Sequence, residues 1–327
     1  RARSLRDNLE LFDILREADR PTIALGMGEF GLMSRVLAPK FGAFLTFASL
    51  RDASATAPGQ PTITELLQRY RFRSISRSTR VYGVVGWPVG HSLSPLIHNA
   101  GFEAIGHDGV YLPLPIASDE EASGAGYESF KATVLELTEH EGLDFCGASV
   151  TIPHKESLAR LATEQSPSGI WRLTPEAAAI GAANTLHIER DPSGRLLSAV
   201  ADNTDAPAIA DCVRDHLPDL AGISVAILGA GGVARAAAWA MASQGANVTL
   251  YARTPARAEQ IATDLGPHTR GRVLASDWDR RHQADARVFI NCTPIGMRGG
   301  PAPDASPIEP HALTACDVGR CIFFDTV

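Results

Sequence analysis

One lysine and two polar clusters hold the side chains that could do acid–base chemistry in this chain. Lys155 follows an apolar strand that ends in Thr-x-Pro-x-Lys, where Pro153 stops the sheet. Ligands of α/β proteins bind at the carboxyl ends of strands, so Lys155 could act there as a proton carrier. Asn184 and Asp205 stand beside apolar runs and could bind a hydroxyl and pair with a positive charge. A lone lysine is usually a solvated surface charge, and the sequence alone does not bring these groups together.

A second candidate site is the turn Gly86-Trp-Pro-Val-Gly-His-Ser-Leu-Ser-Pro95, which follows an apolar strand. Its two hydroxyls, on Ser92 and Ser94, stand before a helix that starts with proline, and such a turn could bind a carboxylate. A plain serine N-cap explains the same spacing equally well. The turn therefore indicates either an anion site or the start of a helix.

The stretch Gly229-Ala-Gly-Gly-Val-Ala234 fits the G-x-G-x-x-[GA] pattern of a dinucleotide-binding turn. The pattern alone is weak, but here an apolar strand precedes it and an alanine-rich helix follows. Gly229 permits the tight turn, Gly231 lets a pyrophosphate approach the backbone, and Ala234 keeps the helix close to the strand. A glycine-rich turn without a ligand is the less favoured interpretation.

The end of the strand that follows the alanine-rich helix indicates whether the chain binds NAD or NADP. Enzymes that use NAD place Asp or Glu about 20 residues after the glycines to hold the ribose hydroxyls. Here that place is occupied by Ala252-Arg-Thr254, with Arg257 one turn further on. Guanidinium groups suit a 2′-phosphate, so the sequence predicts NADP rather than NAD. The alternative is that Arg253 and Arg257 are solvated charges at the start of a helix.

Strands alternate with helices from residue 81 onward, which is typical of a mostly parallel α/β sheet. We expect a substrate-binding domain over residues 81–205 and a doubly wound nucleotide domain of the Rossmann type over residues 206–327. These two domains must position the polar clusters and the glycine-rich turn.

The block before them, residues 1–76, predicts two short strands, each preceded by a helical stretch, and a final helix. The strands are expected at 21–26 and 43–48, and the helices at 5–15 and 62–70. Two strand-and-helix units cannot close a core alone, so this block is expected to be the end of a larger fold. The basic, serine-rich stretch 71–80 predicts a linker.

Composition and charge exclude some classes of function. The formal net charge of −7 argues against a general nucleic-acid binder, which would carry a basic stripe. No apolar run reaches the roughly 18 residues of a membrane helix, and the charged start is unlike a secretory signal. The five cysteines include no C-x-x-C pair, which favours reduced thiols in the cytoplasm and indicates no metal site. The chain lacks an initiator Met and is expected to be a piece of a longer protein.

Six motifs occur in the order found in shikimate dehydrogenases, and the chain resembles that family from Val81 to Val327. They are Val84-Val-Gly-x-Pro-x-x-His-Ser-x-Ser-Pro95, Ser149-Val-Thr-Ile-Pro-His-Lys155, Gly181-Ala-Ala-Asn-Thr185, Asn203-Thr-Asp205, Gly229-Ala-Gly-Gly232 and Asn291-Cys-Thr-Pro-Ile-Gly-Met297. The resemblance implies a two-domain α/β fold and NADP-dependent reduction of 3-dehydroshikimate to shikimate, in the pathway to chorismate and the aromatic amino acids.

The resemblance also implies residue roles. Lys155 would be the catalytic proton carrier, assisted by Asp205. The residues implied to bind the substrate are Ser92, Ser94, Thr151, Asn184 and Asp205. The residues implied to bind NADP are Gly229, Gly231, Gly232, Val233, Ala234, Arg253, Thr254, Arg257, Thr293 and Met297. The family has Asn-Arg-Thr where this chain has Ala-Arg-Thr, so one polar contact to the phosphate is lost but the arginine remains.

The first block resembles the end of a type I 3-dehydroquinate dehydratase, and the order of the two parts resembles the plant-type bifunctional enzyme. The matching stretches are Met27-Gly28, Ser34-Arg35 and Ala57-Pro-Gly-Gln60. The resemblance implies a partial (β/α)₈ barrel in which Arg35, Thr56 and Gln60 would bind the dehydratase substrate. That family's Schiff-base Lys and its His have no counterpart here, and a barrel lacking six units is not expected to turn over.

Other interpretations stay open. A related quinate dehydrogenase would use NAD, and the arginines after the second nucleotide-domain strand argue against it. A quinate-pathway repressor would resemble the same domains without catalysing, and intact Lys155 and Asp205 argue against that. The family continues beyond Val327 with a substrate-contacting Tyr and a helix bearing a Gln, so the chain could also be an inert fragment. The cytoplasm is the expected compartment, or a plastid for a plant protein.

Overall fold

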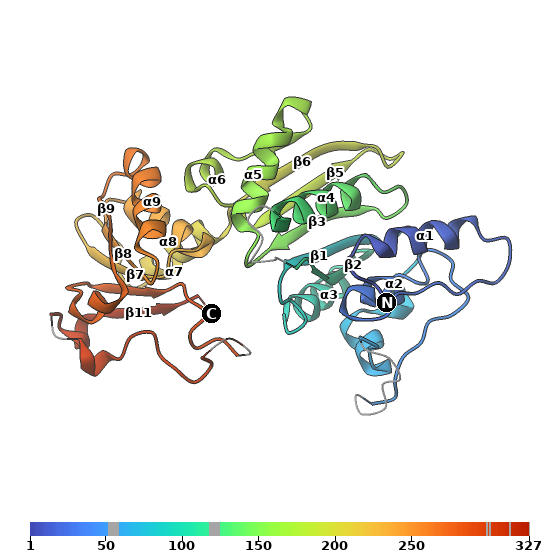
Figure 1. The fold of residues 1–327 in the computed structure, drawn as a ribbon, viewed down its shortest axis with the longest axis horizontal. Coiled ribbons are helices and arrows are strands. Elements are labelled where there is room, and N and C mark those ends of the chain that lie inside the picture. The colour runs from blue at the N-terminus through green and yellow to red at the C-terminus, as the bar shows by residue number, and fades with distance from the viewer. Residues whose placement is uncertain (52–58, 118–124, 299, 301, 314, 327) are drawn as a thin grey trace. The chain divides into compact units, whose positions relative to one another are not determined.

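The computed structural model describes residues 1–51, 59–117, 125–298, 300, 302–313 and 315–326. The chain packs into two compact units, each built around its own sheet (Figure 1). Unit 1 consists of Arg1–Arg172 with Thr185–Ala201, and unit 2 consists of Leu173–Asn184 with Asp202–Val327. The predicted α/β class is confirmed, whereas the three-part division at residues 76 and 205 stays a prediction.

Unit 1 is built on a six-stranded sheet with the order β2-β1-β3-β5-β6-β4. Its strands are β1 (Arg80–Gly86), β2 (Gly109–Pro115), β3 (Phe145–Val150), β4 (Trp171–Leu173), β5 (Thr185–Arg190) and β6 (Leu196–Asp202). The strands β2, β1 and β3 run parallel, and β5 pairs antiparallel with β3. Every residue of β2 is buried, as expected for a strand covered on both faces.

Three helices of unit 1 connect or follow the parallel strands. They are α3 (Ser94–Ala104), α4 (Ala125–Glu139) and α5 (Lys155–Gln165), followed by the short 3₁₀ turn η5 (Ser166–Ser168). Proline stands in the first turn of α3, where its missing amide hydrogen costs nothing. Both α3 and α5 begin where a strand of the parallel part has just ended, so their first residues lie at the carboxyl edge of the sheet.

The first block folds onto this sheet with helices and helical turns, and its described residues, 1–51 and 59–76, form no strand. Its elements are α1 (Asp7–Glu17), η1 (Glu29–Gly31), α2 (Leu32–Val36), the π-helical turn η3 (Glu65–Arg69) and η4 (Phe72–Ser74). The predicted strands at 21–26 and 43–48 are wrong. A single bond, from the Phe44 amide to the Thr22 carbonyl oxygen, joins the two stretches, and Phe44 is 65% exposed. Without further strands beside them, these apolar stretches have no ladder to join.

The stretch 71–80 is tied down and does not behave as a free linker. Lys40 Nζ donates hydrogen bonds to the carbonyl oxygens of Arg77 and Thr79, at 2.9 and 3.0 Å. The same ammonium forms an ion pair with Asp144 at 2.7 Å, and the Lys40 side chain is only 1% exposed. One buried cation therefore joins the first block, the connecting stretch and the start of β3.

Unit 2 is built on a five-stranded sheet with the order β11-β10-β7-β8-β9, and all neighbouring strands are parallel. Its strands are β7 (Ser224–Leu228), β8 (Asn247–Ala252), β9 (Val273–Asp277), β10 (Val288–Asn291) and β11 (Ile322–Asp325). Its helices are α6 (Pro175–Ile180), α7 (Asp205–Arg214), α8 (Gly232–Ala242) and α9 (Pro255–Leu265), with η6 (Gly266–His268), η7 (Trp278–Gln283), η8 (Pro310–Ala312) and η9 (Val318–Arg320). This is the predicted doubly wound nucleotide fold.

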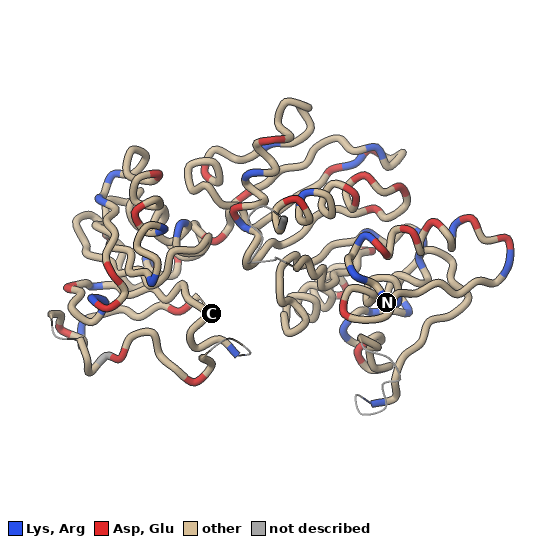
Figure 2. Tube along the Cα trace, in the orientation of Figure 1, with Lys and Arg blue, Asp and Glu red and all other residues tan. Residues whose placement is uncertain are grey.

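Figure 2 shows Asp and Glu interspersed with Lys and Arg in both units. Within the described part of the chain, every helix is too short or too polar to cross a membrane.

We predict that Lys40→Met lowers the free energy of unfolding by about 2–4 kcal/mol, because it leaves two carbonyl oxygens and one carboxylate without their donor. Urea unfolding at neutral pH measures the change. The matched control is Lys131→Met, because the Lys131–Glu164 pair is about a third exposed and should contribute less than about 1 kcal/mol. Equal losses in the two variants would contradict the role given to Lys40.

Candidate functional site

In unit 1 the carboxyl ends of β1 and β3 bring two turns together. The Thr151 amide donates to the Val85 carbonyl oxygen at 2.8 Å, and the Trp87 amide donates to the Ile152 carbonyl oxygen at 2.9 Å. Gly86 makes this approach possible, since a Cβ there would lie 2.4 Å from Thr151 Cγ2. The turn that precedes Lys155 and the turn that carries the serines are therefore neighbours.

Lys155 is the first residue of α5 and is 8% exposed, so it is not the solvated surface charge that a lone lysine usually is. The preceding residue, His154, is 2% exposed and was not predicted from the sequence. Its Nε2 donates to the Ile116 carbonyl oxygen at 2.7 Å, and its ring stacks on Phe130 at 4.9 Å. Burial lowers the pKa of His154, and the hydrogen bond to Ile116 opposes this more weakly. A neutral imidazole therefore anchors the turn from which Lys155 projects.

Ser92 and Ser94 lie in the turn between β1 and α3, and both are half-buried. The Ser94 amide donates to Ser92 Oγ at 3.2 Å, so Ser92 satisfies one amide at the start of α3. The N-cap residue of α3 is nevertheless Leu93, without a side-chain cap bond, so the serine N-cap interpretation is wrong. The bond from the Ser94 amide does not exclude an anion site, because a hydroxyl that accepts one hydrogen bond can still donate another.

In unit 2 a second polar cluster forms where α7 begins. Asn184 Nδ2 donates to Asp205 Oδ1 at 2.8 Å, and Asn184 Oδ1 accepts from the Thr204 amide at 2.8 Å. Asn203, 1% exposed, holds the cluster in place: its Oδ1 accepts from the Asp205 amide at 3.1 Å and its Nδ2 donates to the Ala182 carbonyl oxygen at 2.9 Å. Sequence reasoning assigned no role to Asn203, although the motif Asn-Thr-Asp contains it.

The predicted substrate residues thus fall into two groups. Ser92, Ser94, Thr151 and Lys155 belong to unit 1, whereas Asn184 and Asp205 belong to unit 2. Each group is assembled within its own unit. The meeting of Lys155 with Asp205 stays a prediction.

The glycine-rich turn lies between β7 and α8, at the point where the strand order of unit 2 reverses. The chain adds β8 and β9 on one side of β7 and β10 and β11 on the other. Gly229 has φ of +114°, and a Cβ there would lie 3.0 Å from the Cys292 carbonyl oxygen. Gly231 is exposed, and a Cβ there would meet no atom within 4 Å. Ala234 is 0% exposed, which lets α8 pack closely on the sheet.

The remaining turn residues, Gly232 and Val233, begin α8 and are half-buried. The amide groups of a helix start face the space above the strand ends, and this space is left open on the Gly231 side. A pyrophosphate is the group that such a turn accepts.

The end of β8 lies beside this turn, because the Gly229 amide donates to the Tyr251 carbonyl oxygen at 2.9 Å. Arg253 and Thr254 follow β8, and Arg253 and Arg257 are exposed. The residues that directly follow β8 include no carboxylate that could hold a ribose hydroxyl pair. A dinucleotide with a 2′-phosphate therefore fits these residues better than one without it.

The end of β10 borders the turn from the other side. Asn291, 6% exposed, accepts from the Thr293 amide at 2.9 Å and from its hydroxyl at 2.7 Å. Asn291 Nδ2 donates to the Ile295 carbonyl oxygen at 3.1 Å, which shapes the loop that carries Met297, a half-buried residue. Thr293 Cγ2 lies 3.3 Å from a Cβ built on Gly229, so Thr293 borders the glycine turn directly. Sequence reasoning assigned no role to Asn291.

The residues predicted from the dehydratase resemblance lie in the first block. Arg35 is 2% exposed, its Nη1 donates to the Phe47 carbonyl oxygen at 3.3 Å, and its buried Nε has no hydrogen-bond partner within the described part of the chain. Burial lowers the pKa of Arg35. Gln60 is half-buried, and Thr56 lies outside the described residues. Among the described residues, no group of three His, Cys, Asp or Glu side chains could hold a metal ion.

Comparison with known protein families gives two matches. Residues 1–77 match the family model of type I 3-dehydroquinase, and residues 84–186 match that of the shikimate dehydrogenase substrate binding domain. A bifunctional 3-dehydroquinate dehydratase/shikimate dehydrogenase of Arabidopsis thaliana, named chloroplastic, is 37% identical over 94% of this chain. The chain spans only about half of that relative's length, 48%.

Two further similarities concern the larger part of the chain. A shikimate dehydrogenase (NADP(+)) of Pelobacter propionicus is 36% identical over 72% of this chain and 73% of its own length. The crystal structure of a shikimate 5-dehydrogenase from Thermus thermophilus, in complex with NADP(H) and shikimate, is 28% identical. The structural match covers 75% of this chain and 78% of the Thermus thermophilus chain, with a TM-score of 0.54.

We predict that His154 makes the folded state more stable at neutral than at acidic pH. Its folded-state pKa lies below the ordinary value of 6.5, so the stabilisation is present above that value and is lost as the pH falls below it. In His154→Gln, which keeps a donor for Ile116, the difference in unfolding free energy between about pH 7.5 and about pH 5.5 should shrink. His268→Gln, at an exposed position, is the control and should leave the difference unchanged. An unchanged difference in His154→Gln would contradict the prediction.

Proposed function

The chain belongs to the shikimate dehydrogenase family, and we propose that it interconverts 3-dehydroshikimate and shikimate with NADP as the cofactor. The observation that carries this proposal is a nearly buried lysine at the carboxyl edge of β1 and β3. Lys155 is 8% exposed, begins a helix and directly follows the turn whose Ile152 carbonyl oxygen accepts from Trp87, at the start of the turn that holds Ser92 and Ser94. A buried ammonium next to hydroxyl donors suits a substrate that is both an anion and a ketone.

The reaction needs a hydride donor, a proton donor and groups that hold the substrate. When bound, NADPH supplies a hydride, with its two electrons, to the carbonyl carbon. Lys155 gives its proton to the carbonyl oxygen as the C=O bond pair moves onto that oxygen. Ser92 and Ser94 hold the carboxylate, so that the ring is fixed before the proton moves.

We assign Asp205 to the same centre as the partner of Lys155. A carboxylate close to a buried ammonium favours its charged form and fixes its direction. Asn184, which donates to Asp205 Oδ1 at 2.8 Å, holds the carboxylate in a fixed orientation. Thr151 and Asn184 are the candidate binders of the ring hydroxyls.

For the cofactor, Gly229, Gly231, Gly232, Val233 and Ala234 form the pyrophosphate turn, and Arg253 with Thr254 and Arg257 holds the 2′-phosphate. Thr293 and Met297 border the nicotinamide end. The support for this assignment is the fit of the residues: the open side of Gly231, the two exposed guanidinium groups and the position of Thr293 beside Gly229.

We also propose that residues 1–76 are the end of a dehydratase barrel in a longer bifunctional protein, with Arg35, Thr56 and Gln60 as its substrate-binding residues. The match of residues 1–77 to the dehydratase family and the similarity to the Arabidopsis relative support this. The substrate domain then extends over residues 81–205 and the nucleotide domain over 206–327.

The direct test is to follow NADPH formation with shikimate and NADP⁺, and to repeat it with quinate and with NAD⁺. We expect the fastest turnover for shikimate with NADP⁺. Faster turnover of quinate with NAD⁺ would reassign the chain as a quinate dehydrogenase. Binding of shikimate without any turnover would indicate a sensor instead of an enzyme.

We predict that Lys155→Ala reduces kcat by about 10²–10⁴, the range for one positioned acid–base group, and leaves the Kd for NADPH unchanged. Stopped-flow absorbance measures turnover, and calorimetry measures NADPH binding. The matched control is Lys131→Ala in α4, which should retain wild-type turnover. Retained turnover in Lys155→Ala would remove this lysine from the mechanism.

We predict that Arg253→Ala lowers the preference for NADPH over NADH by roughly tenfold to a hundredfold, because a charge-assisted hydrogen bond to the 2′-phosphate is lost. The ratio of kcat/KM for the two cofactors measures the preference. Arg270→Ala, at an exposed position of the same unit, should leave the ratio unchanged. If the ratio also stays unchanged in Arg253→Ala, the phosphate is bound elsewhere.

A further inference from the structure

The turn that carries Ser92 and Ser94 is held from within by few hydrogen bonds. The Ser92 amide donates to the Val89 carbonyl oxygen at 3.1 Å, and the Ser94 amide donates to Ser92 Oγ at 3.2 Å. At its start, the Trp87 amide donates to the Ile152 carbonyl oxygen. The middle of the turn, Gly90 and His91, is exposed. The geometry of this turn therefore depends on contacts with residues that lie outside it.

One outside contact comes from Arg69, the last residue of the π-helical turn η3 in the first block. Arg69 Nη2 donates to the Ser92 carbonyl oxygen at 2.6 Å, and this part of the guanidinium is partly buried. Arg69 Nε is buried and has no hydrogen-bond partner among the described residues. The donor is charged, so the bond to Ser92 is stronger than a neutral one.

Arg69 is itself held rigidly by a buried asparagine. Asn99 of α3 is 0% exposed, and its Nδ2 donates to the carbonyl oxygens of Arg69 and Tyr111, each at 2.8 Å. Its Oδ1 accepts from the Tyr111 amide at 2.8 Å. One side chain thus joins η3, α3 and β2, and the guanidinium reaches Ser92 from a fixed backbone.

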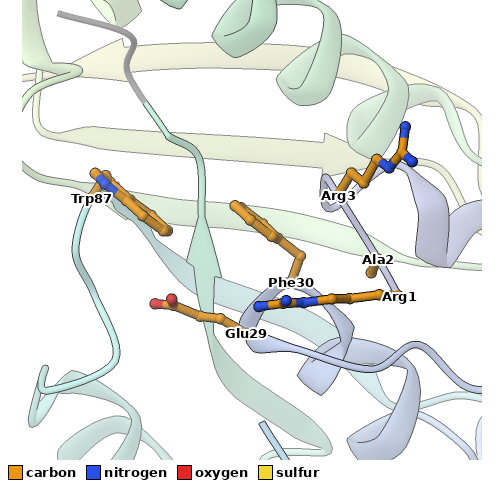
Figure 3. A pocket seen from close by; sticks show the side chains of 6 residues that line it. All are labelled: Arg1, Ala2, Arg3, Glu29, Phe30 and Trp87. Carbon is orange, nitrogen blue, oxygen red and sulfur yellow. The ribbon is translucent and has the colours of Figure 1, made fainter. Parts of the chain in front are cut away.

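The second outside contact is aromatic. The rings of Phe30, in η1, and Trp87 stack with centroids 5.5 Å apart and an angle of 1° between their planes. Figure 3 shows the two side chains next to each other. Both side chains are half-buried and line the same pocket as Glu29. The first block therefore touches the turn at its start, through Trp87, and near its end, through Ser92.

We infer that the first block positions the carboxylate-binding turn of the dehydrogenase part, with Arg69 and Phe30 as the positioning residues. The inference rests on the proposed function, because it assigns Ser92 and Ser94 to the substrate carboxylate. Arg69 fixes the Ser92 carbonyl and thereby the direction of its hydroxyl, and Phe30 fixes the plane of Trp87. Neither residue is a catalytic residue, so their loss weakens substrate binding without slowing the chemical step.

The test compares Arg69→Ala, Arg69→Lys and the control Arg73→Ala in the same 327-residue chain; Arg73 is exposed in the neighbouring turn η4. We expect the KM for shikimate to rise roughly tenfold in Arg69→Ala, with kcat and the KM for NADP⁺ within about twofold of wild type. Lysine retains a charged donor and should recover part of the loss. Arg73→Ala should behave as wild type.

A second pair of variants tests the aromatic contact independently. Phe30→Ala should raise the KM for shikimate about fivefold, whereas Phe44→Ala, at a position 65% exposed in the same block, should not. Melting temperatures of all variants show whether the fold is intact. Calorimetric titration with shikimate alone gives the Kd without turnover.

An unchanged KM and Kd for shikimate in Arg69→Ala would overturn the inference. A fall in kcat at constant KM in Arg69→Ala would also overturn it, because the effect would then not be on substrate binding. The same holds if Arg69→Ala and Arg73→Ala raise the KM equally as their melting temperatures fall, because this result indicates a general structural role. A wild-type chain that binds shikimate but lacks turnover refutes the proposed function, and its variants still test the inference through Kd. A wild-type chain that binds no shikimate refutes both.

Discussion

The carboxyl ends of parallel strands lie at one edge of a sheet, and this constraint positions almost every candidate functional group of the chain. In unit 1 it places the turn after β1 against the turn after β3, in a contact so close that only glycine fits at position 86. In unit 2 it places the ends of β7, β8 and β10 side by side, so that Gly229, Arg253 and Thr293 border one space. Because the strand ladders fix these ends, the groups there are ordered before any ligand arrives.

Much of the fold follows from local patterns in the sequence, and the misses have physical causes. The strand before the glycine turn, the alanine-rich helix after it and the end of the next strand at Ala252 are where the sequence predicts them. The two strands expected before residue 50 are wrong, because strand formation needs neighbouring strands and these stretches have only one mutual hydrogen bond. The antiparallel pairing of β3 with β5 joins segments far apart in the chain, and no local pattern encodes such a register.

The site was predictable where a residue type alone carries the chemistry, as for Lys155 and the glycine turn. It was not predictable where a side chain acts by holding backbone. His154, Asn203 and Asn291 are buried polar residues, and each holds a functional turn in place through a hydrogen bond to a main-chain carbonyl oxygen. Their motif positions are visible in the sequence, but His154 and Asn203 have partners, Ile116 and Ala182, that are 38 and 21 residues away. Arg69, which binds the Ser92 carbonyl oxygen, was also not predictable. It belongs to the first block, which the sequence assigns to a different domain from Ser92.

The path of the chain between the two units limits how such a protein can be rearranged. The chain passes from one unit to the other after residues 172, 184 and 201, so neither unit is one continuous segment. The segment 173–184 contributes Ile180 and Ala182, both fully buried, to the core beneath the nucleotide fold, and Arg235 Nε binds the Ile180 carbonyl oxygen at 2.7 Å. Genetic recombination that exchanged residues 202–327 as a cassette would leave this segment behind. Exchange of the whole of unit 2 therefore requires three coordinated crossovers, after residues 172, 184 and 201, instead of one.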